Sequence, residues 1–272
     1  MSQPFLEFER PPIVELVLGV QFAPLSRLTS GHLGWFWKQF LDDEWVNASD
    51  AVLLADQFET FEEQGRWRMS SKMQVTFDAM AAPPRLQLEN AGGDRMLQVQ
   101  QTRFHYNWKR RDQSYPSFRG VLTEFGKQFT RFGNFLAASG QGELCPNQWE
   151  LTYVDSIPRG ELWQTVADWY RVLPGLLSGP PPIDGVCPEN ASGEWNFEIT
   201  PRRGRLHVTV RQARIAETSE AVLLVQTTAR GPIGRDANED LAGGLALGHA
   251  VAVRTFLQIT SAEAHASWGL KS

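Results

Sequence analysis

The chain has 272 residues, of which 42% are hydrophobic and 21% are charged, and this composition is typical of a soluble globular protein with one large domain or two small ones. Its formal net charge of −5 argues against general binding to nucleic acids or anionic membranes, although a local basic patch is compatible with it. The cysteines have no C-x-x-C spacing, the opening MSQPFLEFER lacks the features of a signal peptide, and no apolar run reaches 18 residues. These features indicate a reduced, cytoplasmic protein with no membrane-spanning segment.

The first part of the chain is predicted to contain four strands and two helices. Apolar residues alternate along the strands, with a hairpin turn at Gly92-Gly93-Asp94. A slip in this alternation between Val99 and Phe104 indicates a bulge near Gln101. The helices show apolar residues at spacings of three and four. The predicted strands are 13–22, 65–78, 85–90 and 95–108, and the predicted helices are 30–45 and 118–136.

The second part of the chain shows the same kinds of pattern in the same order. A stretch of small and turn-forming residues, 137–147, is predicted to link the two parts. Gly244 and Gly248, on the final helix, are expected to let that helix approach its neighbours closely. The predicted strands are 148–157, 194–200, 205–213 and 220–229, and the predicted helices are 160–173 and 238–260.

The order of these elements predicts an α+β fold made of two pseudo-repeated β-α-β-β-β-α halves, 1–138 and 139–272. The halves share little residue identity, so the repeat is one of pattern. We expect one wide antiparallel sheet, or two abutting sheets, with four helices packed on one face. The halves form either two domains or one continuous domain. This order is similar to the saddle of the TATA-binding protein, an analogy of fold that does not give function.

Three stretches together resemble a sporadically distributed family of uncharacterised bacterial proteins of about this length. They are the opening PPIVELVLGVQFAPL, the segment RFHYNWKRRDQSYPSFRGVLTEF and the C-terminal FLQITSAEAHASWG. The resemblance covers nearly the whole chain and its N-terminal signature is fairly specific, but it implies no activity. It implies a bacterial, cytoplasmic protein with the patchy inheritance that is common in two-gene toxin–antitoxin or defence modules.

No linear motif of catalysis is present, because the chain lacks G-x-S-x-G, H-E-x-x-H, Walker and dinucleotide-binding patterns. The five histidines are scattered singly, without a pair at metal-ligand spacing. We therefore expect no catalytic residues, no metal and no cofactor. His249 lies on the apolar stripe of the last helix and is interpreted as a core histidine with one hydrogen bond, in preference to a ligand or a base.

Two short basic runs are candidates for anion binding. Lys109, Arg110 and Arg111 precede a predicted helix, whose N-terminus together with three cations could hold a phosphate. A solvated turn is the favoured interpretation. The run 202–205 is interpreted in the same way, as a hairpin turn. Neither run carries enough interleaved aromatic residues for a nucleic-acid surface.

The strongest candidates for a partner surface are Trp35 and His32 on the first helix. Trp35 falls about 160° around the helix from its apolar stripe, so it has no predicted use in the core. An incidental exposed Trp and an interface anchor are equally compatible with this position.

A second candidate surface is the polar face of the predicted sheet. Glu15 and Glu150 project from the first strand of each half, and each is expected to pair with a neighbouring cation such as Arg68 or Lys72. Alternatively, they line an open, glutamine-rich face that binds a partner. The glutamines of this face are Gln74, Gln87, Gln98 and Gln100.

These features favour a non-enzymatic protein that binds a macromolecule, with a protein partner encoded nearby and a possible role in neutralising a toxin. Self-association is left open, and nucleic acid and membranes are not expected partners. Two alternatives remain. One is a small-molecule-sensing domain with a cleft between the halves. The other is an enzyme whose site is assembled from Glu15, His105 and Asp155 without a linear motif.

Overall fold

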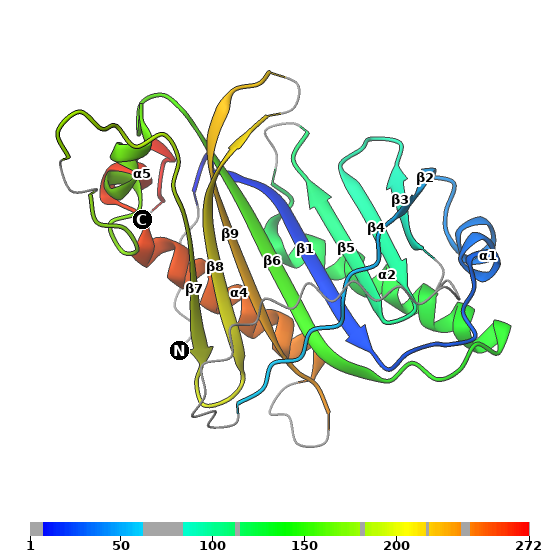
Figure 1. Ribbon diagram of the computed structural model, residues 1–272. Coiled ribbons are helices and arrows are strands. Elements are labelled where there is room, and N and C mark those ends of the chain that lie inside the picture. The colour runs from blue at the N-terminus through cyan, green and yellow to red at the C-terminus, as the bar shows by residue number, and fades with distance from the viewer. Residues whose placement is uncertain are drawn as a thin grey trace.

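The computed structural model describes residues 8–61, 84–111, 115–179, 183–215, 218–234 and 240–271. Within them, nine strands form a single antiparallel sheet in the order β2-β3-β4-β5-β1-β6-β9-β8-β7 (Figure 1). The predicted α+β class is confirmed, and so is a single wide sheet in place of two abutting ones.

The elements have the following bounds. The strands are β1 (Ile13–Phe22), β2 (Trp45–Ala51), β3 (Arg85–Asn90), β4 (Arg95–Gln100), β5 (Arg103–Lys109), β6 (Pro146–Pro158), β7 (Ser192–Ile199), β8 (Gly204–Arg214) and β9 (Ala221–Pro232). The helices are α1 (Ser30–Phe40), α2 (Ser117–Ser139), the short 3-10 helix η1 (Val166–Asp168), α3 (Trp169–Val172), α4 (Leu241–Ile259) and α5 (Ala262–Ser267).

The strands from the two parts of the chain occupy separate blocks of the sheet. The block β2-β3-β4-β5-β1 meets the block β6-β9-β8-β7 where β1 pairs antiparallel with β6 at the centre (Figure 1). The strands of the two halves therefore do not interleave. That the halves superpose as a repeat stays a prediction, as does their division into domains.

Alternation along the strands assigns each side chain to one of two faces. On β1, Leu16, Leu18 and Val20 are each 0% exposed, and they point toward the helices. The residues that alternate with them, among them Glu15 and Gln21, point to the opposite face, as the period of two requires. The antiparallel register of β1 with β5 and β6 extends this division across the sheet.

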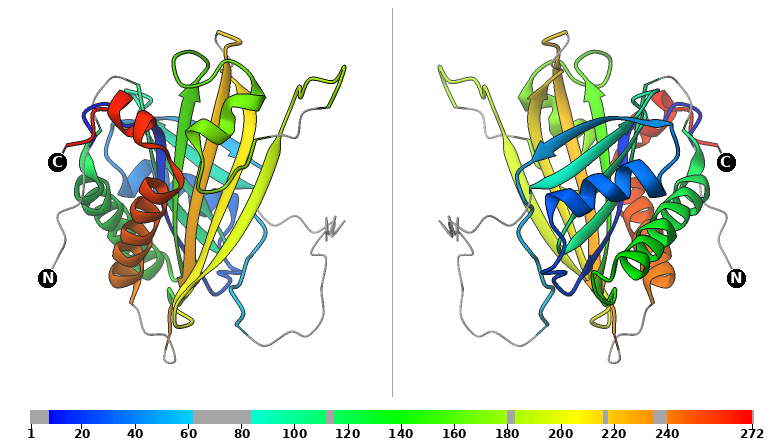
Figure 2. Two further views of the ribbon diagram at one scale, coloured as in Figure 1. Left: turned by 90° about the vertical axis from the view of Figure 1, so that its left-hand side faces the viewer. Right: turned by 90° about the vertical axis from the view of Figure 1, so that its right-hand side faces the viewer.

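The long helices α2 and α4 lie on the same face of the sheet (Figure 2). α2 packs on β1 and β5 and also contacts α1, while α4 packs on β6 and β9. A cluster of aromatic rings joins α1 and α2, with Phe36 in contact with both Phe132 and Phe135. Removing this apolar surface from water is what holds the helices to the sheet.

Trp149 of β6 lies against glycines of α4. A Cβ atom on Gly248 would lie 2.8 Å from the Trp149 ring, and one on Gly244 would lie closer still. The Trp149 side chain is 0% exposed, so the ring has no room to move. This close approach confirms the role predicted for the two glycines.

Several predicted boundaries in the first part of the chain were wrong. The expected bulge near Gln101 is a tight turn, because Gln100 pairs with Arg103 and the chain reverses from β4 into β5. The first helix ends at Phe40 instead of residue 45, and the chain continues into the edge strand β2. The predicted strand 65–78, including Gln74, lies outside the described residues.

The second part follows its prediction more closely. Its four predicted strands are observed as β6, β7, β8 and β9, and its last predicted helix is α4. The predicted helix 160–173 is reduced to η1 and α3, and α5 is an addition. No helix within the described ranges combines the length and the apolar character needed to cross a membrane.

Candidate functional site

On the helix-facing side of the sheet, a partly open cavity of about 830 Å³ lies between α2 and α4. Its floor is formed by the sheet, through Ile13 of β1, Tyr153 and Asp155 of β6, and Thr227 of β9. This volume lies within the range of pockets that hold small molecules. The cavity therefore sits where the helix of one half faces the helix of the other.

The walls of the cavity are mostly apolar. α2 and α4 supply the two long walls, and the N-terminal residues supply a third. Phe8 packs edge-to-face on Phe256 and Trp268, and its backbone bridges to Leu270, so the two ends of the chain meet beside the cavity. The lining residues outside the floor are Phe8, Glu9, Pro11, Pro12, Tyr115, Ser117, Phe118, Arg119, Leu122, Ala246, His249, Ala252, Val253, Phe256 and Lys271.

Two tyrosines and a histidine form a polar cluster in the cavity. The Tyr153 hydroxyl and His249 Nδ1 share a hydrogen bond of 2.7 Å, and Tyr115 interacts with the Tyr153 hydroxyl. Phe118 stacks on the His249 ring with 3.9 Å between centroids. Burial lowers the pKa of His249 to about 4, so its imidazole is neutral near pH 7. The predicted single hydrogen bond is present, but His249 lines a cavity instead of filling the core.

Asp155 is a buried acid at the floor of the cavity. Its position two residues after Tyr153 places it on the same face of β6, and it is 6% exposed. Burial raises the pKa of its carboxyl group to about 7, against the opposing charge of Arg110. Near neutrality the group is therefore part protonated and can either donate or accept a hydrogen bond.

Thr227 presents an unsatisfied hydroxyl group at the same floor. The residue is 1% exposed, and among the described residues its Oγ1 atom has no hydrogen-bond partner. Buried polar groups are almost always hydrogen-bonded, and leaving one unpaired costs about 1–3 kcal/mol.

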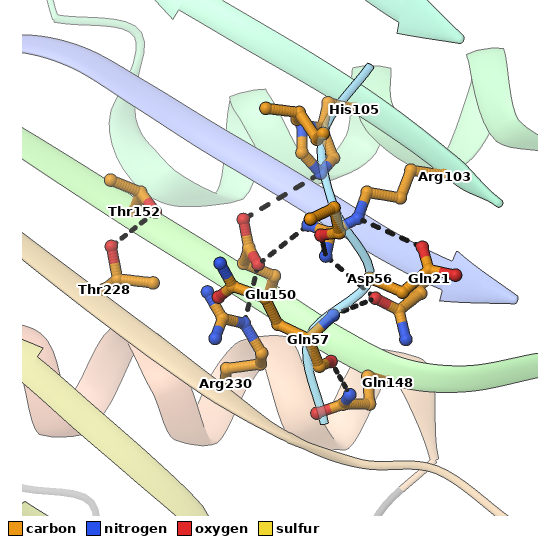
Figure 3. Close-up of polar contacts among 12 residues, drawn as sticks. Gln21, Asp56, Gln57, Arg103, His105, Gln148, Glu150, Thr152, Thr228 and Arg230 are labelled. Carbon is orange, nitrogen blue, oxygen red and sulfur yellow. Dashed lines mark hydrogen bonds and ion pairs between the residues drawn. The ribbon is translucent and has the colours of Figure 1, made fainter. Parts of the chain in front are cut away.

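The opposite face of the sheet carries a charged cluster around Glu150 (Figure 3). Its carboxylate accepts a hydrogen bond of 2.7 Å from Arg230 Nε, and lies 3.5 Å from Arg103 Nη1 and 3.8 Å from His105 Nε2. Burial alone would raise the pKa of Glu150, but the charges around it outweigh burial and hold the pKa below its ordinary value. The expected pairing of Glu150 with neighbouring cations is thus observed, with other cations than Arg68 and Lys72, which lie outside the described residues.

A glycine makes room for this cluster. Gly19 pairs with His105 on one side and with Glu150 on the other, and a Cβ atom at position 19 would lie 2.6 Å from the His105 ring. Burial lowers the pKa of His105 to about 4, so the ring is neutral beside the ionised carboxylate. The charges of the cluster near neutrality are those of Glu150 and the two arginines.

The polar face is also covered by an extended stretch of chain, residues 52–61, which follows β2 and which we call the strap (Figures 1 and 2). Side chains of the sheet hydrogen-bond to its backbone. Gln100, for example, accepts from Leu54 N at 3.0 Å and donates to Leu54 O at 2.9 Å. Over the described residues, the expectation of an open face is therefore wrong.

The other predicted residues of this face have partners within the chain. Gln98 donates to Asn107 at 2.8 Å and accepts from Gln87 at 3.0 Å. Glu15 accepts a hydrogen bond of 2.7 Å from Asn107. The sheet's polar side chains are thus engaged with one another and with the strap.

The basic run at the end of β5 is similarly engaged. Lys109 and Arg111 lie 3.8 Å and 3.6 Å from Glu89, and Arg110 donates to the carbonyl of Pro11 at 2.8 Å. These contacts fit the favoured interpretation of a turn better than they fit an anion site.

The two candidate residues of α1 have structural contacts. The His32 ring lies 2.8 Å from Thr29 Oγ1 at the helix N-terminus, an arrangement that caps the helix. Trp35 is 44% exposed, yet its ring packs edge-on against Phe40 and Phe135. The predicted exposure of Trp35 is thus observed, with edge contacts to Phe40 and Phe135 of the aromatic cluster. A partner-binding role of Trp35 stays a prediction.

The enzyme site imagined from Glu15, His105 and Asp155 does not assemble. Asp155 lies on the helix-facing side of the sheet, whereas Glu15 and His105 lie on the opposite face. Among the described residues no group of three or more His, Cys, Asp or Glu side chains could hold a metal ion.

The sequence offered a cleft between the halves as an alternative, but sequence reasoning did not identify the residues that line the cavity, although one signal was available. The alternation of β6 already placed Asp155 on the face of Trp149, Leu151 and Tyr153, and an acid on a core face is a sign of a site. Tyr115 and Thr227 carried no such signal, because nothing in the sequence around either residue showed that both line one cavity.

Comparisons with known proteins add little. No family model matches the chain and no curated protein matches it, so the family resemblance of the N-terminal signature stays a prediction. Among solved structures, the chain is similar to DynU16, a protein of the dynemicin biosynthetic locus, with 12% identity and a TM-score of 0.26 over 91% of this chain and 96% of that one. Similarity at this level carries no argument.

Proposed function

We propose that this protein binds a small molecule with an apolar body and one polar end in the cavity between α2 and α4. The carrying observation is a mostly apolar cavity of about 830 Å³ with Tyr153, His249 and Asp155 grouped in its lining. Concave pockets of this size with mostly apolar walls and a few grouped polar side chains are typical of small-molecule sites.

The polar groups gather in one part of the cavity, and this supports a fixed orientation of the ligand. Tyr153 and His249 are linked, and Asp155 and Thr227 belong to the same floor. Leu122, Val253 and other apolar side chains of the two helices line the remainder. Apolar walls supply affinity and a few polar groups supply orientation and specificity in sites of this kind. The ligand's polar end is expected at Asp155 and Thr227.

Binding of an uncharged, environment-sensitive dye tests the proposal. Nile red fluoresces strongly only in apolar surroundings, and we expect one saturable site per chain. Ala246 lines the cavity and is exposed toward it, so Ala246→Trp should fill the entrance and weaken binding by about tenfold or more, since a steric block removes most ligand contacts.

Ala242 provides a matched control. It lies one turn earlier on α4, is also exposed, and does not line the cavity. Ala242→Trp should therefore bind Nile red as the unaltered protein does. No saturable binding, or equal binding by both variants, would contradict the proposal.

Recognition of a macromolecule by the first helix or the sheet, including neutralisation of a toxin, was the function favoured by the sequence. Trp35 is exposed on the first helix, whereas His32 caps that helix and the strap covers the polar face. Partner binding by the first helix and the toxin role stay predictions. The polar face has a separate property, which concerns the strap.

A further inference from the structure

The strap is held to the sheet through its backbone. Gln100 makes two hydrogen bonds to the backbone of Leu54. Gln148 does the same farther along, accepting from Glu59 N at 3.2 Å and donating to the carbonyl of Gln57. Each glutamine amide thus pairs with peptide groups as a neighbouring strand would.

Two further side chains complete this backbone recognition. Gln21 accepts from Gln57 N at 3.1 Å, and Arg103 donates to the carbonyl of Ala55 at 2.7 Å (Figure 3). Contacts of this kind depend on the path of a chain and are indifferent to most of its side chains.

Side chains of the strap are recognised as well: Asp56 lies 4.0 Å from Arg103 Nε, and Glu59 makes the closest contacts. Glu59 is 5% exposed at its side chain and lies 2.8 Å from Arg205, 2.8 Å from His207 and 3.2 Å from Arg230. These contacts come from two neighbouring strands, β8 and β9. The sheet therefore contains a preformed site for a carboxylate, with guanidinium groups as its main charges.

The apolar side chains of the strap are largely left in water. Val52, Leu53 and Phe58 are 86%, 39% and 61% exposed. A segment that belongs to the core usually buries such side chains, because their burial is the main stabilising contribution. The strap contributes little apolar burial and is attached by polar contacts that another chain could reproduce.

We propose that the polar face of the sheet is a binding surface for an extended acidic peptide of another protein, and that the strap occupies this surface when the peptide is not bound. The partner peptide would run along the path of residues 52–61, hydrogen-bonded through its backbone to Gln21, Gln100 and Gln148. A carboxylate of the peptide would occupy the place of Glu59. Binding would require displacement of the strap.

A peptide fits this surface better than a nucleic acid does. Gln100 and Gln148 each offer one donor and one acceptor to a single stretch of backbone. A peptide backbone has both complementary groups, whereas a phosphate backbone only accepts hydrogen bonds. The arginines alone would suit either ligand, so the glutamine amides decide between them.

The test uses the full chain with residues 52–61 replaced by a Gly-Ser stretch of equal length. The probe is a fluorescently labelled peptide, VLLADQFETF, which is the sequence of the strap. The replaced protein should bind it at least about tenfold more tightly than the unaltered protein, in which the tethered strap competes at high effective concentration. As a control, the same replacement at residues 183–190, an exposed loop, should leave binding as weak as in the unaltered protein.

The identity of the ligand is tested with two further probes. The same peptide with Gln in place of Glu59 should bind about tenfold more weakly, because it lacks the charge that the arginines recognise. A ten-residue oligothymidylate should bind more weakly than the peptide does.

Each alternative result would overturn the proposal. These results are a strap-replaced protein that folds but does not bind the peptide, equal binding of the Glu and Gln peptides, or preferential binding of the oligonucleotide. A strap-replaced protein that does not fold would also overturn it, because the strap would then be an integral part of the fold. Cooperative thermal unfolding monitored by circular dichroism separates these cases.

Discussion

The two faces of this sheet are covered by different physical means. On one face α2 and α4 bury apolar side chains, yet a cavity of about 830 Å³ with an unpaired Thr227 hydroxyl remains between them. On the other face the strap lies flat, its backbone hydrogen-bonded to Gln100 and Gln148. Rigid helices meet a twisted sheet only along part of their length, whereas an extended chain can follow it. The helices, which bury the apolar side chains, are therefore the cover that leaves a cavity.

The largest expected effect concerns the charges under the strap. Arg230 contacts both Glu150 and Glu59, so Arg230→Met should leave Glu150 without its closest partner and remove one of the two arginines beside Glu59. We expect a loss of about 3–5 kcal/mol in the free energy of unfolding, the usual cost of removing one member of a buried ion pair. Urea denaturation at pH 7 measures it.

A surface ion pair provides the control for this variant. Arg95 lies 3.7 Å from Glu44, and each of the two side chains is more than a third exposed. Arg95→Met should change the free energy of unfolding by less than about 1 kcal/mol. If the two variants lose equal stability, the charged cluster does not hold the strap face together.

The second effect depends on pH and concerns the cavity floor. The Asp155 carboxyl has its pKa raised to about 7 by burial, so between pH 4 and pH 7 the folded protein keeps a proton that the unfolded chain releases. The free energy of unfolding therefore falls over this range and stays lower above it. Asp155→Asn removes this loss, and relative to the unaltered protein its stability should rise by up to about 4 kcal/mol between pH 4 and pH 8.

Urea denaturation of both proteins at several pH values measures this difference. Contributions from other titrating groups cancel because they are shared. If the difference in unfolding free energy between the two proteins stays constant from pH 4 to pH 8, Asp155 titrates as an exposed acid, and the account of its burial at the cavity floor is contradicted.

The third effect tests how closely α4 approaches the sheet. A Cβ atom on Gly248 would meet the ring of Trp149, so Gly248→Ala should lose about 1–3 kcal/mol of stability through overpacking. Gly126 of α2 is exposed, and a Cβ atom there would meet nothing within 4 Å. Gly126→Ala should instead gain up to about 1 kcal/mol from helix propensity. Thermal melts of the pair that move in the same direction would contradict the packing seen around Trp149.

The smallest expected effect concerns Trp35. Because its ring packs on Phe40 and Phe135, Trp35→Ala should lose about 1–2 kcal/mol of stability. Ile183→Ala, at a 61% exposed position, should stay within about 0.5 kcal/mol. If Trp35→Ala also changes the free energy of unfolding by less than about 0.5 kcal/mol, the ring contacts of Trp35 do not stabilise the fold. A partner-binding role then becomes the better interpretation.

Alternation predicted the sheet well because it reports burial on one face directly. The strands β3, β6, β8 and β9 lie within two or three residues of their predicted bounds. The turn between β4 and β5 was missed because Gln101 and Thr102 are not turn-forming residues. Only the pairing of Gln100 with Arg103 reveals it.

The polar face of the sheet and the cavity differ in how far the sequence could predict them. Glu15 and Glu150 were correctly placed on one polar face together with Gln87, Gln98 and Gln100, since parity alone decides that, whereas Gln74 lies outside the described residues. The strap could not be foreseen, because residues 52–61 have no periodicity and are bound through their backbone. The cavity depends on residues from both ends and the middle of the chain, such as Phe8, Tyr115 and Thr227, whose meeting is a property of the tertiary fold.

The most direct measurement is a methyl NMR titration of the Ala- and Val-labelled protein with Nile red. If the cavity is a ligand site, the largest chemical-shift changes will fall on Ala246, Ala252 and Val253, which line it. The methyl groups of Val52 and Ala55 on the strap will stay unchanged, because they lie on the other face of the sheet. Changes centred on the strap, or no changes at saturating dye, would contradict the assignment of the cavity as the small-molecule site.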